Sequence, residues 1–157
     1  KMNPIISSQK GFTLIELILV VSLLGILSIA VFPVLKNREP FALDAAARKV
    51  KSDIRYTQSL ATTTAEPHGF IVTGNSTYQI YNVTTGQIVN SPYHGNLMQE
   101  DLAADFGTSI FQNINHQIEF DEFGQPTIVG GNIIQINNGG DFKQIQITNT
   151  SGHVSML

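Results

Sequence analysis

The sequence contains no cysteine and no tryptophan among its 157 residues. The absence of cysteine excludes a disulfide framework, a thiolate metal site and a cysteine nucleophile. Basic residues are scarce in one region: from residue 56 onward, Lys143 is the only Lys or Arg against eight Asp and Glu, a net charge of −7. Because an acidic surface repels phosphate groups, we expect no nucleic acid among the partners of this region.

The longest apolar run of the chain carries a single charge. It extends from Phe12 to Phe32, reads FTLIELILVVSLLGILSIAVF, and contains only Glu16 as an ionisable residue. A helix of this length spans roughly 30 Å, which is the thickness of the hydrocarbon core of a bilayer. A buried core helix is disfavoured, because helices of soluble proteins keep a polar face. We therefore expect residues 12–33 to form a membrane-spanning helix.

A secretory signal peptide is the alternative interpretation of this run. Ser28 and Ala30 form the small-x-small pattern of a signal-peptidase site, and cleavage there would release a soluble periplasmic binding protein. Glu16 argues against it, since an acid at the centre of a bilayer costs roughly 2.5–3.5 kcal/mol and normally has a partner. Cleavage between Gly11 and Phe12 would place a new α-amine one helical turn before Glu16, where the two can pair.

The octapeptide KGFTLIEL at residues 10–17 resembles the cleavage and methylation motif of type IV pilins and type II secretion pseudopilins. The resemblance implies that prepilin peptidase cuts after Gly11 and that Phe12 becomes the N-methylated first residue. It also implies that Glu16 assists the docking of subunits during assembly. Residues 1–11 would then be the leader peptide.

The same resemblance implies where the protein is located and what it contacts. It predicts a single-pass protein of the bacterial inner membrane, with a cytoplasmic leader and a periplasmic head, that joins a filament of other pilins or pseudopilins. Gly25 and Pro33 match the helix-weakening residues of the family, and both residue types destabilise a helix for independent reasons.

A second helical pattern follows the apolar run. Apolar or small residues recur at spacings of four and three, at Leu43, Ala47, Val50, Ile54, Thr57 and Ala61. This pattern predicts that residues 34–65 form an amphipathic second half of the helix, with one face packed on the head. We expect Pro40 to interrupt or bend the rod where it leaves the membrane.

The remaining residues, 66–157, alternate short apolar stretches with Gly, Asn and Thr, which predicts a β-rich head. We expect strands at Phe70–Thr73, Tyr78–Val83, Gln87–Val89, Ile118–Phe120, Ile133–Ile136 and Gln144–Thr148, and one helical turn within Gln99–Phe106. The predicted fold class is α+β, with a long N-terminal hydrophobic helix packed on an antiparallel β-sheet head.

Three further segments resemble a narrower group. They are a helix with Ala47-Arg48 and Arg55-Tyr56, the stretch IEFDEFGQP at 118–126, and IQITNTSGHV at 145–154. Together they are similar to the GspH/FimT group of minor pseudopilins and minor pilins. The resemblance implies a structural subunit of a type II secretion pseudopilus; the alternative is a minor type IV pilin involved in pilus biogenesis or DNA uptake. The sequence differs from many type IVa pilins in having no cysteine, since those pilins close a C-terminal loop with a disulfide.

Candidate chemical sites are few, and we expect neither enzymatic activity nor a cofactor or metal. Glu119, Asp121 and Glu122 supply the oxygen ligands that calcium prefers, but their alternation with apolar residues favours the exposed face of a strand. The histidines lie apart from one another and are expected at the surface or in turns, at His68, His94, His116 and His153.

Overall fold

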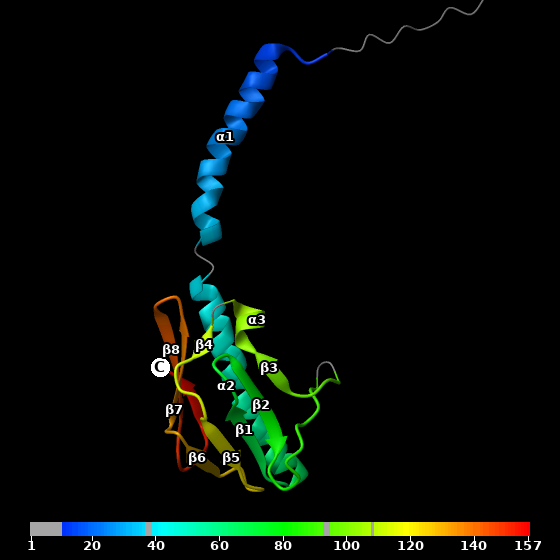
Figure 1. Ribbon diagram of the computed structural model, residues 1–157, viewed down its shortest axis with the longest axis vertical. Helices are drawn as coiled ribbons and strands as arrows, with labels where there is room; N and C mark the ends of the chain where they lie inside the picture. The colour runs from blue at the N-terminus through cyan, green and yellow to red at the C-terminus, as the bar shows by residue number, and fades with distance from the viewer. Residues whose placement is uncertain (1–10, 37–38, 93–94, 108) are drawn as a thin grey trace, which may run out of the picture. The chain divides into compact units, whose positions relative to one another are not determined.

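The computed structural model describes residues 11–36, 39–92, 95–107 and 109–157, without the side chains of residues 29–36, 39 and 40. The chain divides into two compact units, residues 1–38 and 39–157 (Figure 1). The first unit contains helix α1, Leu14–Lys36, and the second is the head, which begins with helix α2, Glu39–Thr64. Most of the predicted leader, residues 1–10, lies outside the described residues.

Helix α1 is apolar on all sides. Its large side chains from Leu14 to Leu27 are 48–77% exposed within the chain. The backbone stays helical through Gly25 and Pro33. These two residues therefore do not end the helix. Whether they weaken it, as expected, stays a prediction.

Helix α2 has one face buried in the head. The six residues of the predicted stripe, Leu43 to Ala61, are at most 2% exposed, which confirms the packing face read from the helical spacing. Pro40 lies in the first turn of α2, where proline is tolerated because its missing N–H would have no helical partner. Pro40 therefore lies at the start of this helix, and the expected interruption or bend of the rod near Pro40 stays a prediction.

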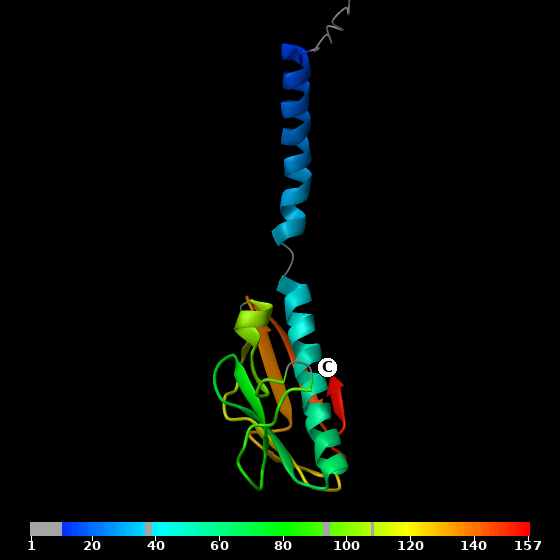
Figure 2. The ribbon, with the colours of Figure 1, turned by 90° about the vertical axis from the view of Figure 1, so that its right-hand side faces the viewer.

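The strands of the head form two antiparallel sheets. One has the order β3-β2-β1-β5-β6 and the other the order β4-β7-β8-β9. Both lie against α2, which contacts β1 and β5 of the first sheet and β7, β8 and β9 of the second (Figures 1 and 2). The elements are β1 His68–Val72, β2 Thr77–Asn82, β3 Gln99–Asp101, α3 Leu102–Phe106, β4 Ile110–Phe111, β5 Gln117–Phe120, β6 Pro126–Val129, β7 Ile133–Asn138, β8 Asp141–Ile147 and β9 Val154–Met156.

The helix-plus-antiparallel-sheet fold class is confirmed, and five of the six predicted strands correspond to β1, β2, β5, β7 and β8. The predicted strand Gln87–Val89 is wrong, because this segment makes only an isolated bridge, between Tyr81 and Ile88. The helical turn expected within Gln99–Phe106 is present as α3, but strand β3 precedes it. Four short strands were not predicted: β3, β4, β6 and β9.

A buried carboxylate ties α2 to the first sheet. Asp53 is 3% exposed, and its Oδ2 accepts hydrogen bonds from the Tyr78 hydroxyl and from Lys49 Nζ, both at 2.6 Å. Burial, and then the charge of Asp53, raise the pKa of Tyr78. Burial alone would lower the pKa of Lys49, but its pairing with Asp53 and Glu100 outweighs burial and raises it.

Gln58, which follows Asp53 by five positions in α2, contacts two turns of the head. Gln58 Nε2 donates to the carbonyl of Gly124, between β5 and β6, and to that of Ser151, between β8 and β9, at 2.8 and 2.9 Å. Gly124 and Gly152 have φ of 79° and 66°, which favours glycine. A Cβ at either position would also lie within 3 Å of α2 side chains. Thus one amide of α2 fixes two turns that are distant in the sequence.

Tyr78→Phe should destabilise the head by about 1.5–3 kcal/mol, because it removes a hydrogen bond to a buried carboxylate. Tyr81→Phe is the matched control: the Tyr81 hydroxyl donates to Glu119 at 2.6 Å but is only part-buried, so the expected loss is smaller. Chemical denaturation of both variants in detergent micelles measures the difference. Equal losses would contradict the assigned role of Asp53.

Candidate assembly site and docking surfaces

The start of α1 combines a helix cap with an acid in the first turn. The backbone N–H of Glu16 donates to the Thr13 hydroxyl at 3.3 Å, which is one half of a capping box. An acid in the first turn also interacts favourably with the positive end of the helix. Thr13 therefore positions the local backbone, while the carboxylate of Glu16 stays exposed.

Gly11, Phe12 and Glu16, the three residues to which the processing motif assigns a role, are exposed. Phe12 is 81% exposed, and Gly11 has nothing within 4 Å of a Cβ built on it. In the described part of the chain, no cation pairs with the carboxylate of Glu16. This geometry is compatible with a protease cutting between Gly11 and Phe12; the cleavage, the methylation and the pairing of Glu16 stay predictions.

Among the helices of the described residues, none is both long enough and apolar enough to cross a membrane. The prediction of a membrane segment over residues 12–33 is therefore not confirmed by the structure.

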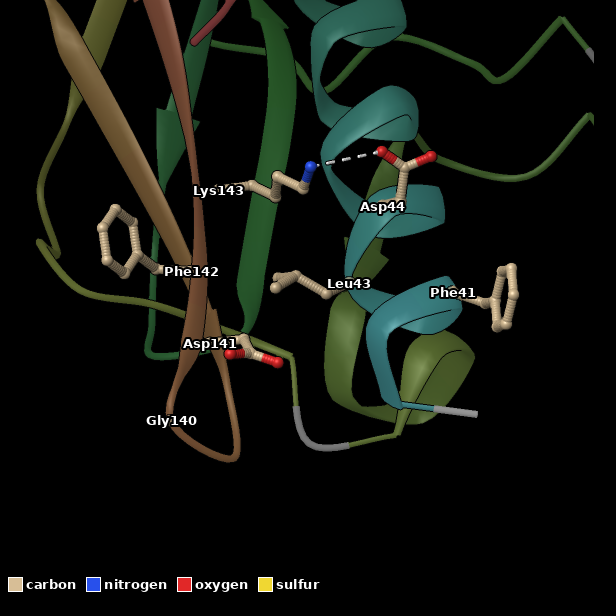
Figure 3. A pocket seen from close by; sticks show the side chains of 7 residues that line it. All are labelled: Phe41, Leu43, Asp44, Gly140, Asp141, Phe142 and Lys143. Atoms are coloured by element: carbon tan, nitrogen blue, oxygen red, sulfur yellow. Dashed lines mark ion pairs between the residues drawn. The ribbon is translucent and has the colours of Figure 1, made fainter. Parts of the chain in front are cut away.

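A cavity of about 470 Å³ opens between the first turns of α2 and the β7–β8 hairpin. Figure 3 shows Leu43 pointing between α2 and β8, with Phe41 and Phe142 projecting outward on either side. Lys143 Nζ lies 3.8 Å from Asp44 at this cavity, and Asp141 is also part of its wall. The hydrogen bond from Arg48, and then nearby positive charge, lower the pKa of Asp44. We call this site the Phe41–Phe142 cavity.

A second hollow, of about 290 Å³, lies beside α2 and β9. We call it the basic groove, because its lining is Arg48, Lys51, Ser52, Arg55 and Met156. Arg48 pairs with Asp44 at 2.7 Å, and Arg55 donates to the Val154 carbonyl at 3.1 Å. Lys51 is therefore the cation of this groove with the fewest competing contacts.

Two of the three acids weighed as calcium ligands, Glu119 and Asp121, take part in hydrogen bonds within the chain. Glu119 accepts hydrogen bonds from Tyr81 and Gln117, and Asp121 accepts from the N–H groups of Phe123 and Gln125 at 3.0 and 2.8 Å. Within the described residues, no group of three or more acidic or His side chains is arranged to hold a metal ion. These carboxylates instead stabilise a strand face and a turn.

Two of the four histidines are buried, which corrects the expectation of surface or turn positions. His68 is 4% exposed, with its Nδ1 2.8 Å from the Glu66 carbonyl, and His116 is 1% exposed. Both ring nitrogens of His116 lack a well-formed hydrogen bond, although the Gly131 backbone lies close enough to oppose the effect of burial. Burial dominates and lowers the pKa of His116. His153 is exposed, and His94 lies outside the described residues.

An apolar N-terminal helix with an exposed processing motif, followed by a helix packed on antiparallel sheets, defines a pilin-like protein. Residues 6–32 match the family model of the prokaryotic N-terminal methylation motif. The chain is 33% identical over 133 residues to competence protein ComGD of Bacillus subtilis (strain 168), covering 84% of this chain and 83% of that protein. The chain therefore belongs to the family of type IV pilin-like proteins that includes ComGD.

Solved structures show the same fold. The type IV minor pilin FimU of Pseudomonas aeruginosa (strain PAO1) matches with a TM-score of 0.54 and 15% identity, over 76% of this chain and 90% of FimU. A second crystal form of FimU gives a TM-score of 0.50 and 14% identity, over 73% and 92% of the two chains. These structures show that the chain has the fold of a pilin-like protein. The narrower prediction of a GspH-type pseudopilin of type II secretion is not confirmed.

Glu16→Gln should reduce incorporation of the subunit into filaments without reducing cleavage, because it keeps the size of the side chain and removes the charge that a neighbouring amine can pair with. Thr13→Ala is the matched control, since it removes the cap and keeps the carboxylate. Immunoblots of membrane and sheared-filament fractions measure both steps. Normal assembly of Glu16→Gln, or an equal defect in Thr13→Ala, would contradict the pairing role.

The head should lose stability as the pH falls below about 6.5, the ordinary pKa of His116. Because burial lowers the folded-state pKa of His116, the unfolded chain binds the proton more readily. The contribution of the neutral His116 ring to the stability of the head is therefore complete above pH 6.5 and is lost as the pH falls to the folded-state pKa. One such group contributes a slope of at most about 1.4 kcal/mol per pH unit. Asp44 and Asp101, whose pKa values are lowered from 3.8, titrate at lower pH.

Thermal melting between pH 7.5 and 5.5 measures this slope. His116→Leu should flatten it, because the group that must be protonated is gone. An unchanged slope in this variant would contradict the role assigned to His116.

Proposed function

We propose that this chain is a structural minor subunit of a competence-type pilus, a surface filament that takes part in DNA uptake. The observation that carries the proposal is the 33% identity to competence protein ComGD across more than four fifths of both chains. The match to the N-terminal methylation motif supports the same class of protein. The head would lie on the outer side of the cytoplasmic membrane, with α1 as its anchor before assembly.

The proposed role is assembly, not catalysis. Prepilin peptidase would cut between Gly11 and Phe12 and methylate Phe12. Helix α1 would then leave the membrane and pack with the helices of other pilin-type subunits, which would cover the apolar surface that its own chain leaves exposed. The head would contribute contacts at the filament surface.

Participation in type II secretion is the competing role, and a genetic experiment separates the two. Deletion of the gene should reduce transformation by DNA to the background level and leave the secretion of exoproteins unchanged. Wild-type complementation should restore transformation. Gly11→Leu should not, because the peptidase requires a small residue there, and an immunoblot should show the uncut precursor. A secretion defect with normal transformation would overturn the competence role and favour secretion.

We also expect DNA to contact other subunits of the filament and not this head. Nonspecific affinity for DNA depends on the number of phosphates that basic side chains neutralise. In the basic groove, Arg48 and Arg55 already have partners within the chain, so Lys51 is the most available cation.

Fluorescence anisotropy with duplex DNA and the full chain in detergent, at about 0.15 M salt, should therefore show no micromolar, salt-sensitive binding. Lys51→Glu combined with Arg55→Glu is the control and should leave the trace unchanged. Micromolar binding that this double variant abolishes would instead assign the basic groove as a phosphate-binding site.

A further inference from the structure

The basic groove has positive charge that the head does not neutralise. Its lining contains three cations and no acid. Asp44 pairs with Arg48 at 2.7 Å, whereas Arg55 donates to the uncharged carbonyl of Val154 at 3.1 Å. Among the residues that the structure describes, no carboxylate lies within ion-pair distance of Lys51 or Arg55. The groove therefore favours a negatively charged occupant.

The groove also has an apolar part, which restricts the occupant further. Met156 of β9 lines it and is partly buried against the core of the head. A thioether packs favourably against an aromatic ring. An occupant that carries a carboxylate beside an aromatic side chain would therefore match both parts of the lining.

The chain itself has such a segment in residues 121–125, between β5 and β6, which we call the acidic turn. Glu122 is exposed and has no ion-pair partner among the described residues, and Phe123 is 77% exposed. The carboxylate of Asp121 accepts hydrogen bonds from the N–H groups of Phe123 and Gln125, which fixes the backbone of the turn. Binding therefore orders few additional groups, and a segment ordered in advance binds at a lower entropic cost.

The acidic turn is held away from the groove of its own chain. Gln58 donates to the Gly124 carbonyl at 2.8 Å, and Thr62 lies beside the same glycine. These two residues follow Lys51 by seven and eleven positions, which is roughly 10–16 Å along a helix. A second head in the same orientation, shifted by this distance along α2, would bring its acidic turn level with the groove of the first.

We propose that the basic groove receives the acidic turn of a second copy of this chain. Glu122 pairs with Lys51 and Arg55, and Phe123 packs on Met156. Each copy offers both surfaces, so the contact is head-to-tail and repeats along a row of subunits without closing. The contact rests on the proposed role as a filament subunit, and it does not depend on whether the filament serves DNA uptake or secretion.

Thiol crosslinking in cells that assemble the filament tests the contact, because the chain contains no cysteine of its own. Two full-length copies with different epitope tags are expressed together, one with Ser52→Cys in the groove and the other with Gln125→Cys in the acidic turn. Both positions are exposed, and both substitutions keep the charges of the contact. The matched control pair combines Ser52→Cys with Asp105→Cys, an exposed position in α3. A short bismaleimide joins neighbouring cysteines, and blotting for both tags identifies mixed dimers.

The expected result is a mixed dimer several-fold stronger for the groove and turn pair than for the control pair. Adding Glu122→Lys to the turn copy should lower its yield several-fold, because like charges then meet at Lys51. Adding Lys51→Glu to the groove copy should restore it, which a general loss of folding would not allow. A yield at the control level, or a loss that Lys51→Glu does not restore, would overturn the proposal.

A pair of aromatic variants tests the apolar part of the contact. Phe123→Ser in the turn copy should lower the mixed dimer several-fold with an unchanged melting temperature. Phe142→Ser is the matched control, since Phe142 is also exposed, at 57%, and should leave the yield unchanged. Equal yields from the two variants would contradict the contact between Phe123 and Met156.

The wild-type chain separates failure of this contact from failure of the proposed function. If it is absent from sheared filaments, the subunit role itself fails. If it is present and the mixed dimer stays at the control level, only the groove contact fails. Micromolar binding of duplex DNA that Lys51→Glu abolishes, together with a mixed dimer at the control level, would assign the groove to phosphate instead.

Discussion

Burial of one face of α2 is the constraint on which the head depends. Both sheets pack against this helix, and its stripe from Leu43 to Ala61 is at most 2% exposed. A head without cysteine has no disulfides to limit its unfolded state, so its stability comes from packing and hydrogen bonds.

Polar contacts at two positions along α2 fix how the helix is aligned with the sheets. Asp53 holds Tyr78 of the first sheet near the middle of the helix, and Gln58 holds turns of both sheets one to two turns later. A buried carboxylate costs free energy unless it is fully paired, and here a hydroxyl and an ammonium pair it. Apolar burial alone would tolerate a helix shifted by one turn, whereas these directional contacts would not.

The sequence predicted those parts of the fold that are periodic. The α2 stripe and the alternation in β2, β7 and β8 extend over enough residues to show a period. Strands β3, β4 and β9 have two or three residues and no readable period, and β6 begins with Pro126, which is allowed because β6 is an edge strand. The processing motif was readable because it is local, whereas the Phe41–Phe142 cavity joins residues about one hundred positions apart.

The difference between a competence subunit and a secretion subunit must lie on the surface of the head. In the proposed role, helix α1 and its motif would serve processing and helix packing, which both kinds of filament require. A fold shared at 15% identity does not carry function with it. The buried α2 face and the Asp53 contacts are likewise internal. The residues that remain to select neighbouring subunits are the exposed ones of the head, above all Lys51 in the basic groove and Phe142 at the cavity. Electrostatic and apolar complementarity at such sites excludes wrong partners as well as binding right ones, so the role of the subunit follows from the neighbours these residues accept.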